Sequence, residues 1–139
     1  LKVMAAAGGI PDSRVDEVLE LVELTEAANK RTKNYSLGMK QRLALAGAIL
    51  GDPEVLILDE PANGLDPLGI AWLRKFLRSL AGSGRTILVS SHQLAEMQNT
   101  VDDVIIMHRG KLITSGSMKD IIKDGTLEEA FLKLAEGVN

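Results

Sequence analysis

The feature that most constrains the fold of this chain is a short apolar run that ends in two acids. Residues 55–58 read Val-Leu-Ile-Leu, and Asp59, Glu60 and Pro61 follow directly. An apolar run between Pro53 and Pro61 is typical of a strand buried on both faces of a parallel sheet. In such sheets the chemistry takes place just beyond the carboxyl ends of the strands, where the two acids fall. One carboxylate can hold a hard metal ion, directly or through its water, while the other handles a water molecule, so the pair predicts half of a nucleotide-hydrolysing site.

The same acids also have a structural interpretation, because an acid at the end of a strand can cap the following turn. Burial of the preceding strand favours a functional role for Asp59 and Glu60. Two carboxylates beside a core are costly unless a cation or a proton transfer requires them.

Composition narrows the class of protein. The 139 residues suffice for one domain or a piece of one, and 45% hydrophobic with 25% charged residues is typical of a soluble globular protein. The net charge of −3 gives no argument for a nucleic-acid partner, and the absence of Cys excludes disulfides and thiolate metal sites. The longest apolar stretch, residues 43–50, is far shorter than the ~20 residues that span a bilayer. Because the chain begins with Leu1 instead of Met, we expect a truncated sequence.

Two zones of different periodicity divide the chain at about residue 50. Residues 1–50 carry only helical periodicity, whereas strands alternate with helices from residue 54 onward. In the first zone we expect a helix that begins at 11–13, with Val15, Val18, Leu19 and Val22 on one face, and a helix over 37–50. In the second zone we expect a strand over 54–59, a helix from Asp66-Pro67 to 82–84, a strand over 86–89, a helix over 93–99 and a strand over 104–107. A hairpin turn at Arg109-Gly110 into 111–115 and helices over 118–123 and 127–135 complete the expected elements. This order predicts an α/β fold with a parallel sheet and right-handed crossovers.

Residues 36–39, Ser-Leu-Gly-Met, lie at the predicted start of the helix over 37–50. The free N–H groups and the positive end of the helix dipole make this position suited to an anion. Gly38 lowers helix stability by up to ~1 kcal/mol but lets a ligand approach the backbone. The alternative interpretation is a Ser36 cap with an incidental glycine, and no Glu or Gln follows three residues later to complete a capping box.

Three further side chains are compared with the requirements of such a site. Asp66 before Pro67 is a good helix N-cap, whatever else it does. His92 follows the strand over 86–89 as the two acids follow their own strand, which raises it above an ordinary hydrogen-bonded histidine. His108 beside a hairpin turn is expected to be structural. The Gly-rich phosphate loop G-x-x-x-x-G-K-[ST], which such a site needs, does not occur in the sequence.

The ordered motifs resemble one family. Residues 35–43 (Tyr-Ser-Leu-Gly-Met-Lys-Gln-Arg-Leu), then 55–61, then 64–67 (Gly-Leu-Asp-Pro), then 91–92 (Ser-His) are similar to the C-terminal two-thirds of an ABC transporter ATP-binding subunit. The resemblance implies a P-loop ATPase-like parallel sheet that lacks its phosphate-loop strand, with a helical subdomain over 1–50 and the ATPase core over 51–139.

The resemblance also implies the roles of individual residues. Ser36, Leu37, Gly38 and Met39 match the signature motif, Asp59 the Walker B aspartate that acts on magnesium, Glu60 the general base, Asp66 the D-loop aspartate, and His92 the switch histidine that senses the γ-phosphate of ATP. The commonest signature is Leu-Ser-Gly-Gly-Gln, so Leu37 replaces a glycine and Met39 replaces a glutamine. This form is similar to that of bacterial antibiotic- and multidrug-export subunits.

We therefore expect a truncated ATP-binding subunit of an ABC exporter that is itself inactive because the phosphate loop is missing. Implied cofactors are ATP and magnesium, and implied partners are a transmembrane permease and a second ATP-binding subunit across ATP. Location at the cytoplasmic face of the cell membrane is implied too. A missing central strand would leave an exposed edge that favours pairing with another chain. A soluble ABC ATPase without a transport role and a non-catalytic assembly fragment are the alternatives, and the cargo cannot be read from the sequence.

Overall fold

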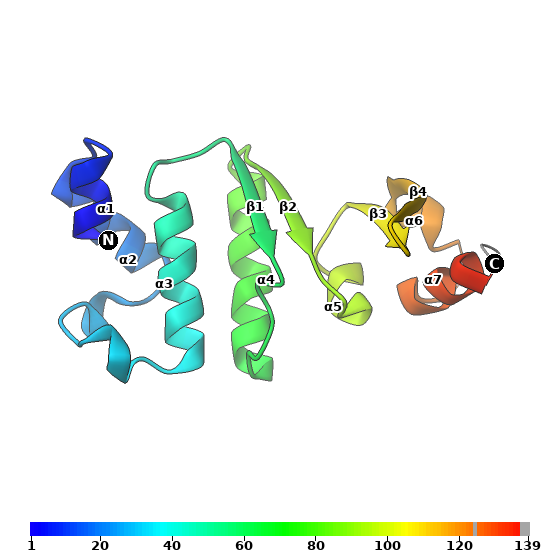
Figure 1. The fold of residues 1–139 in the computed structure, drawn as a ribbon, viewed down its shortest axis with the longest axis horizontal. Helices are drawn as coiled ribbons and strands as arrows, with labels where there is room; N and C mark the ends of the chain where they lie inside the picture. Colours follow the sequence, from blue (N-terminus) through cyan, green and yellow to red (C-terminus); the bar gives the residue numbers. More distant parts are fainter. Residues whose placement is uncertain (124, 137–139) are drawn as a thin grey trace. The chain divides into compact units, whose positions relative to one another are not determined.

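The computed structural model describes residues 1–123 and 125–136 and forms two compact units, Leu1–Ser90 and Ser91–Asn139. The first unit holds a helical part followed by a strand–helix–strand part, and the second holds a β-hairpin with short helices (Figure 1). The predicted α/β class and the predicted order of elements are confirmed.

The helical part contains no strand, as the periodicity of residues 1–50 predicts. Its elements are α1 (Lys2–Ala7), α2 (Asp12–Leu21), the short 3₁₀ turns η1 (Thr25–Ala27) and η2 (Thr32–Asn34), and α3 (Leu37–Ile49). The predicted apolar face of α2 is buried, with Val18 and Val22 fully inaccessible to solvent. The sequence did not predict α1, because a six-residue helix that ends at a Gly-Gly turn is too short to show a period.

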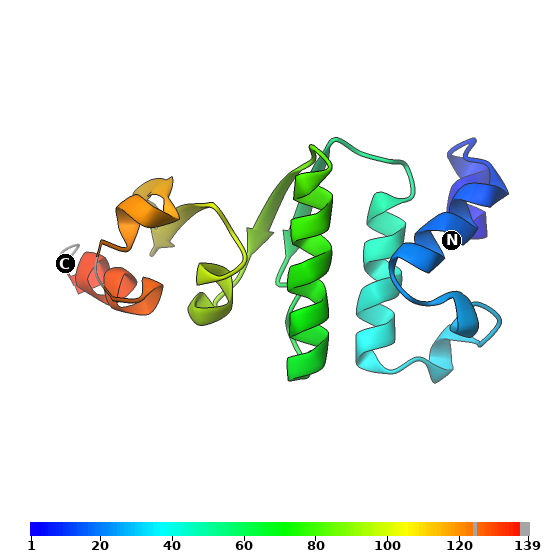
Figure 2. The same ribbon diagram turned by 180° about the vertical axis from the view of Figure 1, so that it is seen from behind.

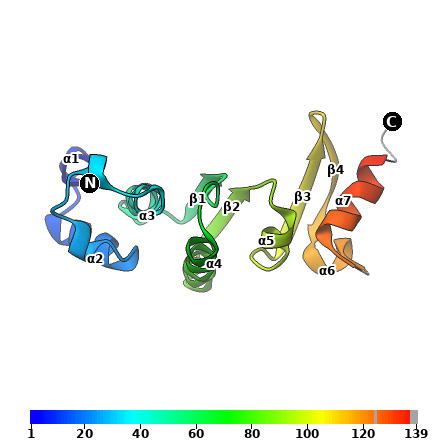
Figure 3. The same cartoon turned by 90° about the horizontal axis from the view of Figure 1, so that it is seen from below.

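A parallel pair of strands follows. β1 (Val55–Asp59) pairs in register with β2 (Thr86–Ser90), and α4 (Pro67–Gly82) connects them. Figure 2 shows α4 lying across one face of the two strands, and Figure 3 shows the same layer edge-on. Leu73, Phe76, Leu77 and Leu80 of α4 are buried, as expected for an amphipathic crossover helix.

The prediction that β1 is buried on both faces is wrong in this structure. Leu56 and Leu58 are buried, but Val55 is 57% exposed and Ile57 is 74% exposed. The same face of β2 exposes Leu88, which lies opposite Ile57 in the register. The physical reason is that α4 covers one face only, and among the described residues of the first unit no element covers the other.

The second unit is built on an antiparallel hairpin. β3 (Asp103–His108) and β4 (Lys111–Ser117) meet at Arg109-Gly110, and both turn residues have positive φ, which suits a two-residue hairpin turn. The helices of this unit are α5 (Leu94–Gln98), α6 (Met118–Ile121) and α7 (Leu127–Glu136). The amide of Leu127 donates to Gln98 Oε1 at 2.9 Å and thereby joins α7 to α5. Within the described ranges, no helix is both long and apolar enough to cross a membrane.

Candidate functional site

The two predicted acids lie at the carboxyl end of β1, beside the end of β2. Asp59 stands opposite Ser90 in the register, and the Ser90 hydroxyl donates to the Asp59 carboxylate. The same hydroxyl accepts from the Glu60 amide at 3.0 Å, and the Ser90 carbonyl accepts from that amide at 3.2 Å. One residue of β2 therefore contacts both acids. Asp59 is exposed and Glu60 is partly exposed, so neither is sealed inside the core.

Glu60 adopts a left-handed backbone conformation with a φ of 47°. This conformation is uncommon for residues other than glycine, asparagine and aspartate, and it turns the chain sharply out of the strand. The amide of Asn63 then donates to the Glu60 carbonyl at 3.0 Å, which closes a turn. Pro61 and Ala62, the two central residues of this turn, are buried. Glu60 is thus held in place by hydrogen bonds of both its amide and its carbonyl group.

The predicted signature segment forms the start of α3. Ser36 is the N-cap residue, and its hydroxyl accepts from the Met39 amide at 3.2 Å. The Lys40 amide donates to the Ser36 carbonyl at 3.0 Å. The capping interpretation of Ser36 is therefore realised, and the Leu37 and Gly38 amides are the ones that precede these bonds at the helix start.

The segment after the acids folds back onto the start of α3. Gly64 has a φ of 74°, a conformation that favours glycine, and a Cβ on it would lie 2.6 Å from Leu37 Cδ2, so the end of the Leu37 side chain would have to shift. The side chain of Gln41 donates to the Asn63 carbonyl at 3.4 Å. The structure therefore brings together two segments, 36–41 and 63–66, that the sequence pointed to separately.

Asp66 begins α4 as predicted. Its Oδ1 accepts from the Gly69 amide at 2.8 Å, and Pro67 occupies the first helical position. The capping role predicted for Asp66 is confirmed, and the D-loop role that the resemblance implies stays a prediction.

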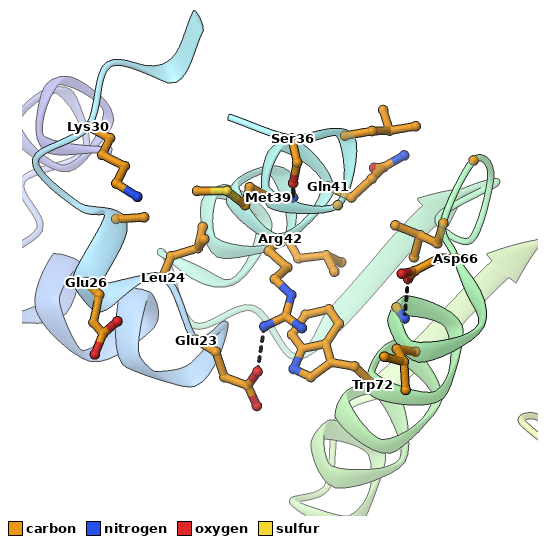
Figure 4. A pocket seen from close by; sticks show the side chains of 18 residues that line it. Glu23, Leu24, Glu26, Lys30, Ser36, Met39, Gln41, Arg42, Asp66 and Trp72 are labelled. Atoms are coloured by element: carbon orange, nitrogen blue, oxygen red, sulfur yellow. Dashed lines mark hydrogen bonds and ion pairs between the residues drawn. The ribbon is translucent and has the colours of Figure 1, made fainter. Parts of the chain in front are cut away.

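An open groove of about 630 Å³ lies between the starts of α3 and α4 (Figure 4). Arg42 is one of the residues that line the groove. The Arg42 guanidinium lies 4.1 Å from the centre of the Trp72 ring and 2.5 Å from the Glu23 carboxylate. Trp72 in turn stacks on Phe76 at 5.1 Å between ring centres. Five of the predicted site residues also line the groove and so share one surface: Ser36, Leu37, Gly38, Met39 and Asp66.

The two histidines belong to the second unit. His92 is exposed and lies two residues beyond the end of β2, beside Ser91, whose hydroxyl accepts from the Gln93 amide at 3.0 Å. His108 makes an edge-on contact with Phe131 at 6.2 Å between ring centres, in agreement with its predicted structural role.

Sequence reasoning missed Ser90, Gln41 and Arg42. A usable signal for Ser90 did exist. Ser90 ends one apolar strand as Asp59 ends another, and parallel strands of equal length end at the same edge of a sheet. The contacts of Gln41 and Arg42 join residues 19 to 30 positions apart, so no local sequence pattern predicts them.

The acids at the end of β1 suit a magnesium ion whose other ligands are water and phosphate. They do not form a closed site in which protein side chains alone bind the metal. Mg²⁺ in nucleotide sites is bound through one or two carboxylates, with water and phosphate oxygens completing its shell. Asp59 and Glu60 supply two adjacent carboxylates of this kind. Across residues 1–123 and 125–136, no group of three or more Asp, Glu, His or Cys side chains could form a closed cage.

Fold and site together define an α/β protein with paired acids at the carboxyl edge of a parallel strand pair. Comparison with known proteins gives the family: residues 4–63 match the model described as ABC transporter. The chain is 50% identical over 113 residues to "Uncharacterized ABC transporter ATP-binding protein YhcH" of Bacillus subtilis (strain 168), covering 81% of this chain and 37% of that protein. It is 46% identical to "Bacitracin transport ATP-binding protein BcrA" of Enterococcus faecalis, covering 84% of this chain and 38% of the relative.

Among solved structures, a "Structure of ATP binding subunit of ABC transporter" superposes with a TM-score of 0.82 at 29% identity, covering 96% of this chain and 60% of that chain. The chain belongs to the family of ABC transporter ATP-binding domains. It spans less than two-fifths of the length of the two curated relatives.

Proposed function

We propose that the complete gene product containing these residues binds and hydrolyses ATP as the ATP-binding subunit of an ABC exporter. The observation that carries the proposal is the meeting of Asp59, Glu60 and Ser90 at the carboxyl edge of β1 and β2. In α/β proteins this edge is where ligands bind.

Within that function each strand-end acid has a separate task. Glu60 accepts a proton from the water that attacks the γ-phosphate, as a general base. Asp59 holds Mg²⁺, directly or through its water, and the ion when bound neutralises the charge that develops on the phosphate oxygens. His92 is proposed on the family motif to steady the γ-phosphate.

The start of α3 is proposed to contact the γ-phosphate of an ATP bound mainly by a second subunit. Since Ser36 already occupies the amides of Met39 and Lys40, this contact falls to the amides of Leu37 and Gly38. Gly38 leaves room for close approach, whereas Leu37, which is 53% exposed, packs against the Gly64 turn. We propose Asp66 as a second dimer contact beside it.

The proposed partners follow from the same roles. Residues 1–50 form the helical subdomain that contacts a membrane permease at the cytoplasmic face of the membrane, and residues 51–139 belong to the ATPase core. The relative named for bacitracin transport supports export of a peptide antibiotic as the process that hydrolysis drives.

Hydrolysis is tested with the purified complete gene product and one substitution. Glu60→Gln keeps the size of the side chain and removes the base, so turnover of MgATP is expected to fall about 100- to 10,000-fold. Glu54→Gln, at an exposed acid just before β1, is the matched control and is expected to keep full turnover. Equal turnover by wild type and Glu60→Gln would refute the assignment. The 139-residue chain alone, which contains no phosphate loop, is expected to show no turnover.

Export is tested separately in cells. Deletion of the gene is expected to raise sensitivity to bacitracin or a related peptide antibiotic, and the Glu60→Gln gene is expected not to restore resistance. Unchanged sensitivity to such peptides, combined with normal ATP turnover in vitro, would reject the export role while leaving hydrolysis intact.

A further inference from the structure

The Ser90 hydroxyl bridges the two acids. It donates to the Asp59 carboxylate and accepts from the Glu60 amide at 3.0 Å. A hydroxyl carries one donor and two acceptor positions, so it can make both bonds at once. An alanine at this position could make neither, whereas a threonine could make both.

The register explains why Ser90 reaches both acids. Asp59 and Ser90 are directly paired, so their side chains leave the same face of the two strands. Thr86 occupies that face at the opposite end of β2, opposite Val55 and away from the acids. Only the last position of β2 lies beside the turn that begins at Glu60.

The bond to the Glu60 amide matters because that residue is left-handed, with a φ of 47°. A glutamate rarely adopts this conformation unless its surroundings hold it. The direction in which the Glu60 side chain leaves the backbone depends on this dihedral angle. The bond to Asp59 likewise occupies one carboxylate oxygen and limits rotation of that side chain.

We infer that Ser90 is a positioning residue that sets the orientation of both the metal-holding acid, Asp59, and the general base, Glu60. The inference rests on the proposed function, and it adds Ser90, the last residue of β2, to the two acids that follow β1. Ser90 acts through Asp59 and Glu60 and itself touches neither ATP nor the metal.

The test compares Ser90→Ala, Ser90→Thr and the control Thr86→Ala in the complete gene product. Hydrogen–deuterium exchange at single-amide resolution measures the Glu60 amide. In Ser90→Ala this amide loses the hydroxyl acceptor and keeps the backbone carbonyl of residue 90, so its exchange is expected to accelerate about 3- to 10-fold. Ser90→Thr and Thr86→Ala are expected to exchange at the wild-type rate.

The second measurement is the Mg²⁺ concentration that half-saturates ATP hydrolysis. Ser90→Ala is expected to raise it about 3- to 10-fold, with restoration by Ser90→Thr and no change in Thr86→Ala. Unchanged Glu60 exchange in Ser90→Ala, or accelerated exchange with an unchanged Mg²⁺ requirement, would overturn the inference. A wild-type protein without turnover would refute the proposed function instead, and the Glu60 amide exchange would then decide the positioning role by itself.

Discussion

The two ends of β1 carry acids in the same unusual backbone conformation but in opposite chemical settings. Asp52, before the strand, has a φ of 52°, and Glu60, after it, has a φ of 47°. At the amino end, Arg85, directly before β2, forms an ion pair with Asp52, and Arg14 of α2 lies 3.6 Å from the same carboxylate. At the carboxyl end, the residue of β2 that meets the acids is the neutral Ser90.

This difference separates an acid that holds the fold from the acids that we propose for chemistry. Asp52 joins three segments through two arginines, and its charge is balanced inside the chain. The Asp59 carboxylate receives a hydrogen bond from a neutral hydroxyl, which orients its charge without balancing it. A cation is therefore better accommodated at the carboxyl end of the strands than at the amino end.

The largest expected effect is a loss of activity without a loss of stability at Asp59. Asp59→Asn keeps an oxygen that can accept from Ser90 but removes the charge, so ATP turnover of the complete gene product is expected to fall at least about 10-fold. Its free energy of unfolding is expected to stay within about 0.5 kcal/mol of wild type, since the side chain is exposed. Turnover assays and urea denaturation of the same preparations measure both. Strong destabilisation by Asp59→Asn would mean that Asp59, like Asp52, holds the fold.

The second effect concerns the Gly64 turn that joins the acids to the start of α3. Gly64→Ala places a Cβ 2.6 Å from Leu37 Cδ2 in a backbone with positive φ, so a destabilisation of about 1–3 kcal/mol is expected from denaturant titration. Adding Leu37→Ala is expected to recover the part that is due to the clash. Gly82→Ala, at the end of α4 where a Cβ meets nothing within 4 Å, is the control and is expected to leave stability unchanged or slightly raised. A neutral Gly64→Ala would contradict the described approach of the two segments.

The third effect separates capping from chemistry at Asp66. Asp66→Ala removes the acceptor for the Gly69 amide and is expected to cost about 1 kcal/mol of stability. Asp66→Asn keeps a good cap and is expected to retain stability. If Asp66 also serves the dimer contact proposed for it, Asp66→Asn lowers turnover of the complete gene product while thermal denaturation shows the wild-type midpoint. Wild-type turnover in that variant would leave Asp66 with the structural role alone.

The same two ends of β1 show how far sequence reasoning could reach. The strand and its terminal acids were predictable, because an apolar run between prolines leaves few alternatives and Asp59 and Glu60 follow it directly. The caps at Ser36 and Asp66 were also predictable, because in each case the amide that donates to the capping side chain lies only three residues away.

What failed needed information from outside the local window. The exposure of Ile57 depends on which elements cover the sheet, whereas the apolar pattern reports only side-chain chemistry. The bridge by Ser90 depends on the register of strands 31 residues apart in sequence. The contact of Leu37 with Gly64 depends on how the turn after Glu60 folds back onto α3.

The smallest expected effect is a dependence of stability on pH at the amino end of the strand. The hydrogen bond from Arg85, its charge, and the charge of Arg14 hold the pKa of Asp52 below its ordinary value of 3.8. An acid with a lowered folded pKa adds stability at pH values above its unfolded pKa, and that contribution disappears as the pH falls through the folded pKa. Asp52→Asn is therefore expected to be less stable than wild type at neutral pH, with a difference that shrinks below pH 3.8.

The measurement is the free energy of unfolding of wild type and Asp52→Asn from about pH 7 down to the acid limit of folding. Because Asp52 is at the surface, added salt is expected to reduce the difference as well. Glu54→Gln serves again as the matched control, since it removes a nearby exposed acid without touching either arginine ion pair. A difference that persists unchanged at low pH would mean that the charge of Asp52 does not stabilise the fold. In that case the arginines around Asp52 would not distinguish the amino end of β1 from its carboxyl end.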